Sequence, residues 1–215
     1  NIMTFKLAVK TIAKRHGMHA TFMPKPKSGV SGSGMHINMS LRKDGRNIFA
    51  DETDRFGLSQ DAYYFIGGLM KHVYSMTAIT NPLVNSYKRL VSGFEAPLHI
   101  AWSVTNRSPL IRIPSSFGSG TRIELRSPDS AANPYLTIAL CLAAGLDGIK
   151  NKITPPENIQ KNIFHMTEEE KEQLHIKSLP TNLYDAVCAM ERDAFIREIL
   201  GEHISNVYIG SKKDE

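Results

Sequence analysis

Two segments of the sequence place side chains that could bind metal ions and phosphates at every second position. In a β-strand, residues i and i+2 point the same way, so each segment would present its polar side chains on one face. A neutral imidazole and a carboxylate are competent ligands for a divalent metal, and arginines suit phosphate and carboxylate oxygens. The polar positions are His36, Asn38 and Ser40 in the first segment and Arg122, Glu124 and Arg126 in the second.

Arg112 extends this pattern to a third segment, where it projects opposite Ile111 and Ile113. If the three strands are neighbours in one sheet, their polar faces merge into a concave surface. That surface would carry an imidazole, a carboxylate and several guanidinium groups. A metal ion beside several arginines suits phosphoryl transfer, in which a protein mainly positions groups and neutralises the charge on the phosphoryl oxygens.

Simpler interpretations of the same residues stay open at this point. Arg122, Glu124 and Arg126 could form an exposed, salt-bridged strand face, since surface ion pairs are common and weak. His36 could be a hydrogen-bonded structural histidine. The glycine-rich segment 27–34 fits a flexible turn better than a phosphate cradle, because it leads into a strand and not into a helix as a P-loop does. The residues alone therefore predict an enzyme or binding domain with a candidate metal and anion site.

Alternation of apolar and polar residues predicts the strands that position these side chains. The strongest pattern is residues 35–41, where Met35, Ile37, Met39 and Leu41 alternate with polar residues, which indicates a half-buried strand. The tripeptide 43–45, Lys-Asp-Gly, predicts a hairpin turn. Further strands are predicted at 18–23, 48–49, 99–104, 109–114 and 121–126.

Helical periodicity predicts the elements that support the strands. Thr4 could cap a helix that ends at Gly17, and Ser59 could cap a long helix that ends at Asn81-Pro82. The helix predicted at 135–149 is apolar nearly all round, which is typical of a buried helix. We expect an irregular loop at 85–97 and two or three amphipathic helices within 157–215.

The composition is that of an ordinary globular protein, with 41% hydrophobic and 22% charged residues. The net charge is +5, but no basic block is interleaved with aromatic residues, so we expect no nucleic-acid partner. No apolar run is long enough to cross a bilayer, and no secretory leader is present, so we expect no membrane association. Cys141 and Cys188 are interpreted as buried thiols in a reducing compartment. The ends, at Asn1 and Glu215, suggest a piece excised from a longer protein.

Several motifs, in order along the chain, resemble those of glutamine synthetases, particularly the bacterial type I enzymes. The resemblance is dense over residues 1–150 and looser afterwards, and a series of long motifs is far more specific than a single glycine loop. The resemblance implies a catalytic-domain core at 1–150, followed by a helical C-terminal segment of the same domain at 151–215. The motifs are Ala20 to Pro26, Gly32 to His36, Asn85 to Leu90, Gly93 to Pro97, Asn106 to Ser108, Arg112 to Pro114, Arg122 to Arg126 and Asn133 to Leu136.

The resemblance also implies a fold, an activity and a role for each site residue. The fold would be α+β, with a curved, mostly antiparallel sheet and helices packed on its outside. The activity would be that of a glutamate–ammonia ligase, in which ATP phosphorylates glutamate and ammonia then displaces phosphate. The implied roles are metal ligands at His36 and Glu124; glutamate contacts at Gly32, His36, Arg89 and Arg126; ATP and phosphate contacts at Asn38, Ser40, Arg107, Arg112 and Arg122; and catalytic roles for Glu95 and Arg107.

The family also implies partners and cofactors. The substrates would be glutamate, ammonia and ATP, with Mg²⁺ or Mn²⁺ as the metal. The protein would be cytoplasmic, would have regulatory protein partners and would form a large homo-oligomeric ring, a dodecamer by resemblance. Glu95 would lie on a loop that shields the intermediate and takes a proton from ammonium. The remaining metal ligands are expected on segments before Asn1, so we expect this chain to be inactive alone.

The sequence departs from the family pattern at three places. Position 31 is Ser where many relatives carry Asn, and the loop 115–120 has no lysine. Phe164 stands where relatives regulated by adenylylation carry a tyrosine, so that control should be missing.

Two alternative functions remain open: a relative that joins glutamate to an amine or polyamine, and a non-catalytic structural or binding relative.

Overall fold

The computed structural model describes residues 1–104 and 106–215, and its central element is a four-stranded sheet in the order β1-β7-β6-β5. Within this sheet, β1 with β7 and β7 with β6 are antiparallel, whereas β5 and β6 are parallel. The expected α+β class with a mostly antiparallel sheet is confirmed. The strands are β1 (Ile37–Met39), β2 (Arg42–Lys43), β3 (Arg46–Asn47), β4 (His99–Ile100), β5 (Trp102–Ser103), β6 (Ile111–Arg112), β7 (Ile123–Leu125) and β8 (Lys177–Ser178).

The strand register brings the predicted polar face together. Asn38 on β1 and Arg112 on β6 are both paired with Glu124 on β7. The alternate residues Ile111 and Ile123 are buried in the core, which is why the intervening polar residues all emerge on the opposite face. The expectation that the polar faces of the three strands merge is therefore confirmed.

Two separate two-stranded ladders, β2-β3 and β4-β8, accompany this sheet. β2 and β3 form a hairpin around Asp44 and Gly45, whose φ angles of 50° and 77° suit the left-handed turn that an Asp-Gly pair favours. The predicted hairpin turn is confirmed, but its second strand is at 46–47 and not at 48–49. The strand predicted at 18–23 is wrong, because these residues have no ladder partner. Phe22 instead packs its ring 6.0 Å from that of Phe5.

The longest helix, α2, begins after Ser59, whose hydroxyl accepts a hydrogen bond from the backbone N–H of Ala62 as predicted. It packs closely on α4, because glycines let the two backbones touch. A Cβ added to Gly68 would lie 2.1 Å from the Ala144 carbonyl oxygen. The α-helices are α1 (Ile2–Arg15), α2 (Gln60–Thr80), α3 (Val84–Arg89), α4 (Pro134–Lys150), α5 (Glu168–Gln173), α6 (Leu183–Arg192), α7 (Ala194–Leu200) and α8 (Glu202–Lys213).

Four helix predictions need correction. Thr4 does not cap the first helix, because α1 begins at Ile2 and its N-cap residue is Asn1. The region 85–97 is not wholly irregular, because α3 occupies its start; the Ser86 hydroxyl accepts a hydrogen bond from the Leu83 N–H and so caps that helix. The segment 157–215 contains four α-helices, not two or three. α4 is not buried all round, because only one side packs on α2. Its other side exposes an apolar row, comprising Tyr135, Ile138, Leu142 and Leu146.

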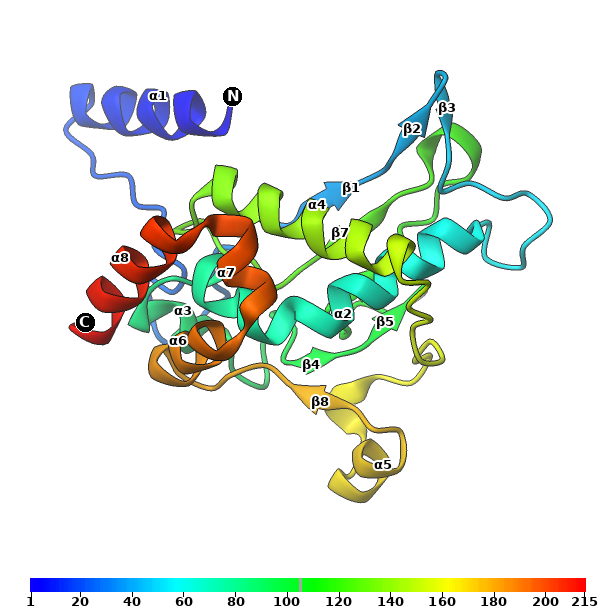
Figure 1. The fold of residues 1–215 in the computed structure, drawn as a ribbon. Helices are drawn as coiled ribbons and strands as arrows, with labels where there is room; N and C mark the ends of the chain where they lie inside the picture. The colour runs from blue at the N-terminus through cyan, green and yellow to red at the C-terminus, as the bar shows by residue number, and fades with distance from the viewer. Residues whose placement is uncertain (105) are drawn as a thin grey trace.

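Figure 1 shows α2 and α4 lying beside the sheet, with α6, α7 and α8 gathered at one end. One main core joins α2, the four-stranded sheet and these C-terminal helices. α1 stands off from the other helices in the figure and has no buried residue. No helix in the described parts of the chain is long and apolar enough to span a membrane.

Candidate functional site

A small cavity of about 210 Å³ lies where the start of β1 and the end of β7 meet the glycine-rich segment and the loop after α3. Four sequence-predicted glutamate contacts and the predicted catalytic Glu95 all line it. Residues up to 95 positions apart, from Ser31 to Arg126, are thus brought to one place by the sheet pairing and the two loops. The lining residues are Ser31, Gly32, Gly34, His36, Arg89, Phe94, Glu95, Ala96 and Arg126.

The two predicted metal ligands lie side by side at this cavity. His36 Nδ1 is 3.2 Å from Glu124 Oε1, and Arg112 Nε is 3.0 Å from Glu124 Oε2 as an ion pair. Burial and the charge of Arg126 lower the pKa of His36, although the hydrogen bond to Glu124 opposes this. A lowered pKa favours the neutral imidazole, which is the form that coordinates a metal.

The donor set fits a divalent cation in part. Glu124 Oε2 is buried and is ion-paired with Arg112, yet no contact within the described residues gives it a hydrogen bond of good geometry, which leaves room for a cation to approach it. An imidazole and a carboxylate suit Mn²⁺ and, through the oxygen, Mg²⁺. Among residues 1–104 and 106–215, no group of three or more His, Cys, Asp or Glu side chains gathers around one point. His36 and Glu124 can therefore supply only part of a coordination shell.

Arg89 is held rigidly under the cavity. Its side chain is buried, Nη1 donates to the Ser127 carbonyl at 2.7 Å, and Nη2 donates to the Arg126 carbonyl at 3.2 Å. Burial lowers the pKa of Arg89, and the charge of Asp129 opposes this effect. Asp129, which the sequence analysis did not single out, is itself buried and accepts a hydrogen bond from Asn81 at 3.0 Å.

Arg126, which directly follows β7, also lines this cavity. Its Nη1 donates to the carbonyl oxygen of Arg107, and its buried Nε makes no hydrogen bond within the described residues. Burial lowers the pKa of Arg126; the charges of Glu124 and Glu95 oppose this, whereas those of Arg112 and Arg107 reinforce it. The Nε of Arg126 lies 3.9 Å from Glu124 Oε2, too far for a hydrogen bond, and a buried donor of this kind beside a cavity suits an anionic ligand.

Arg107 does not line this cavity. Its backbone carbonyl contacts Arg126, whereas its guanidinium is exposed and does not line the cavity. No described contact shows the Arg107 side chain meeting a phosphate site, so that role stays a prediction.

A second polar group lies further along the same strand face. Arg122 donates through Nε to Asn38 Oδ1 at 3.1 Å and through Nη1 to Ser116 Oγ at 2.7 Å. Ser40 directly follows β1 and is exposed. Asn38 and Arg122 are therefore in contact, and none of Asn38, Ser40 and Arg122 lines the small cavity, so their predicted nucleotide and phosphate contacts stay predictions.

Two glycines shape the cavity by their lack of a side chain. A Cβ added to Gly32 would lie 2.3 Å from the Pro24 carbonyl oxygen and 3.1 Å from Arg89 Cγ. A Cβ added to Gly34 would lie 2.8 Å from both Arg89 Nη2 and His36 Nε2. Any larger residue would push the glycine-rich segment off Arg89 or His36, so the backbone must come close at these positions.

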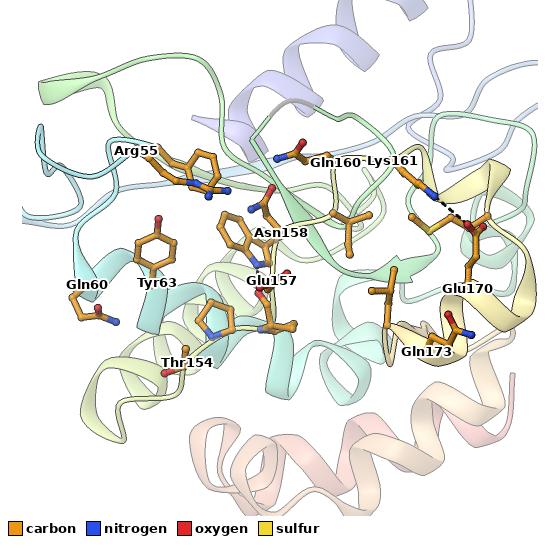
Figure 2. A pocket seen from close by; sticks show the side chains of 17 residues that line it. Arg55, Gln60, Tyr63, Thr154, Glu157, Asn158, Gln160, Lys161, Glu170 and Gln173 are labelled. Atoms are coloured by element: carbon orange, nitrogen blue, oxygen red, sulfur yellow. Dashed lines mark hydrogen bonds and ion pairs between the residues drawn. The ribbon is translucent and has the colours of Figure 1, made fainter.

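A larger cavity lies elsewhere, and Figure 2 shows it. It measures about 870 Å³ and is lined by Tyr63 and Trp102, whose rings are 5.8 Å apart, and by residues 154–161. Trp102 Nε1 donates to the Pro156 carbonyl at 2.7 Å, which ties this segment to β5. None of the predicted site residues lines this cavity, so its size alone does not make it the reaction centre.

Comparison with known proteins assigns the chain to a family. A model of the glutamine synthetase catalytic domain matches residues 1–215. The chain belongs to the glutamine synthetase family. Curated relatives named glutamine synthetase, from Clostridium saccharobutylicum and Methanosarcina mazei, are each 57% identical over the whole chain. The chain spans about half the length of these relatives, since each match covers 48% of the relative.

Solved structures of the family agree with the fold. A structure described as a GmaS/ADP complex superimposes with a TM-score of 0.89, at 41% identity, over 100% of this chain and 49% of that one. A structure described as apo GmaS without ligand gives a TM-score of 0.86 over 99% of this chain. The resemblance expected from the motifs is thereby confirmed, and the family match covers residues 1–215.

Proposed function

We propose that the complete protein joins ammonia to glutamate at the expense of ATP and releases glutamine. One observation carries this proposal: the cavity that contains Arg89, Arg126 and Glu95 adjoins the strand face that contains Glu124 and Arg112. An anion pocket next to a metal and phosphate face is what a ligase needs to phosphorylate a carboxylate. Family membership and the ADP complex of a structural neighbour support the choice of ATP.

In the first proposed step, a γ-carboxylate oxygen of glutamate attacks the γ-phosphorus of ATP. The bond from that phosphorus to the bridging oxygen breaks, and ADP leaves with the electron pair. Arg89 and Arg126 hold the carboxylates of glutamate, while Arg107, Arg112 and Arg122 hold the phosphates and the phosphoryl group in transfer. Asn38 and Ser40 contact the nucleotide. Arginine suits these tasks because its planar fork matches carboxylate and phosphate oxygens.

In the second step, ammonium gives a proton to Glu95, and the free ammonia attacks the carbonyl carbon of γ-glutamyl phosphate. The bond between that carbon and the phosphate oxygen breaks, and phosphate leaves with the electron pair and takes up the surplus proton of the attacking nitrogen. Glu95 is exposed at the mouth of the cavity, where a cation can reach it. The acyl phosphate hydrolyses readily, so the loop that carries Glu95 must also exclude water.

A bound Mg²⁺ or Mn²⁺ would neutralise phosphate charge, and His36 and Glu124 are the residues that would hold it. We further propose that the remaining ligands come from other parts of the complete protein, which works in the cytoplasm as a large homo-oligomer, a dodecamer by family resemblance. Cys141 and Cys188 are free thiols, which supports a reducing compartment.

The test is a product assay on the purified full-length protein with glutamate, ATP and either ammonia or a panel of amines. We expect glutamine to form with ammonia, with one ADP released per glutamine. A preference for an amine over ammonia would replace this proposal with the amine-ligase alternative. ADP release without any amide product would overturn both.

A further inference from the structure

Lys25 connects the segments that line the small cavity, although it does not line the cavity itself. Lys25 as a whole is only 9% exposed to solvent. Lysines are seldom buried this far unless a partner compensates for the lost hydration of the ammonium. The described partners of its Nζ are a carbonyl oxygen and an aromatic ring, not a carboxylate.

These two partners belong to the two loops on either side of the cavity. Lys25 Nζ donates a hydrogen bond to the carbonyl oxygen of Val30, in the glycine-rich segment 27–34. The same nitrogen lies 3.4 Å from the centroid of the Phe94 ring, which is a close cation–π contact. Phe94 directly precedes Glu95 in the loop 92–97, named here the flap loop.

The backbone of Lys25 is fixed independently of its ammonium. Its N–H donates to Asn85 Oδ1 at 2.8 Å, and Asn85 Nδ2 donates back to its carbonyl oxygen at 3.0 Å. Asn85 lies in α3, the helix that carries Arg89. Lys25 therefore extends from a point anchored to α3 and reaches both loops with one charged group.

We propose that Lys25 is a positioning residue that holds the flap loop over the cavity through Phe94 and so places Glu95. This inference rests on the proposed function, because it concerns how that reaction is shielded. Removing the ammonium removes the cation–π contact with Phe94 and the hydrogen bond to the Val30 carbonyl oxygen. Another apolar side chain can still fill the space of the buried lysine stem. The flap loop then opens more often, and water reaches the acyl phosphate.

The expected result is uncoupling, not simple loss of activity. Lys25→Met keeps an unbranched apolar stem without the charge, whereas Lys25→Arg keeps a cation that can stack on Phe94. In the full-length protein, we expect Lys25→Met to lower kcat/KM for glutamine formation about tenfold and to raise the phosphate released per glutamine well above one. Lys25→Arg should restore most of the coupling.

Phe94 and Lys27 supply matched controls. Phe94→Leu should uncouple as Lys25→Met does, whereas Phe94→Tyr keeps the ring and should stay coupled. Lys27→Met removes an exposed lysine two residues away and should keep the wild-type ratio. If Lys25→Met fails to fold, as judged by circular dichroism and assembly size, the pair of Phe94 variants carries the test.

The measurement is the ratio of phosphate to glutamine, taken with saturating glutamate and ATP. A ratio of one in both Lys25→Met and Phe94→Leu would overturn the inference, even if both variants were less stable. Lack of glutamine formation by the wild-type protein would instead overturn the proposed function, so the two failures are distinguishable.

Discussion

Replacing Arg89 by lysine tests whether the buried guanidinium recognises glutamate. The guanidinium bonds two backbone carbonyls, at 2.7 and 3.2 Å, and still borders the cavity. A lysine ammonium keeps the charge but has no planar fork, so it cannot satisfy both carbonyls and also present a donor to the ligand. We therefore expect the loss of one charge-assisted hydrogen bond, about 1.5–3 kcal/mol.

That loss corresponds to a drop of about 10- to 150-fold in kcat/KM for glutamate. Steady-state kinetics of the full-length protein, with glutamate and ATP varied separately, measures it. Arg122→Lys is the matched control, because Arg122 lies outside the cavity and contacts Asn38 and Ser116. It should raise KM for ATP and leave KM for glutamate nearly unchanged. A KM for glutamate within twofold of wild type in Arg89→Lys would refute the reasoning.

Three further predictions concern stability and reactivity. Gly68→Ala should destabilise the protein by about 1–3 kcal/mol in denaturant titration, because the new Cβ would lie 2.1 Å from the Ala144 carbonyl oxygen. Burial raises the pKa of Asp147, but hydrogen bonds from a histidine and a lysine outweigh this effect and bring the pKa below its ordinary value. A carboxyl whose pKa is lower in the folded than in the unfolded protein stabilises the fold at pH values above its unfolded-state pKa. The difference in free energy of unfolding between wild type and Asp147→Asn should therefore narrow as the pH falls below about 4. A difference that stays constant with pH would contradict this. Burial raises the pKa of the Cys141 thiol to about 12, so alkylation followed by mass spectrometry should modify the partly exposed Cys188 first.

Much of the sheet and its polar face is predictable from local pattern. Alternation alone places Glu124 opposite buried Ile123 and Leu125, and the same rule places Asn38. Whether these strands are neighbours cannot be read from alternation, because pairing depends on contacts far apart in sequence. The His36–Glu124 contact joins residues 88 positions apart and became an expectation only through family resemblance.

The errors have physical causes of the same kind. Residues 18–23 have strand-like composition, yet they find no neighbouring strand; the Phe22 carbonyl instead accepts a hydrogen bond from Ser130 Oγ. α4 was expected to be buried because it is apolar all round, but packing against α2 covers only one side. Lys25 carries no local signal of its contacts, because Val30 and Phe94 meet it only after the chain has folded.

The most direct test of the central claim is the fate of the glutamate oxygen. Full-length protein is given glutamate labelled with ¹⁸O in the γ-carboxylate, together with ATP and ammonia, and the released phosphate is analysed by mass spectrometry. If the carboxylate attacks the γ-phosphorus, each phosphate released with glutamine carries one ¹⁸O atom. Phosphate without ¹⁸O, in a reaction that still forms glutamine, would contradict the acyl-phosphate mechanism.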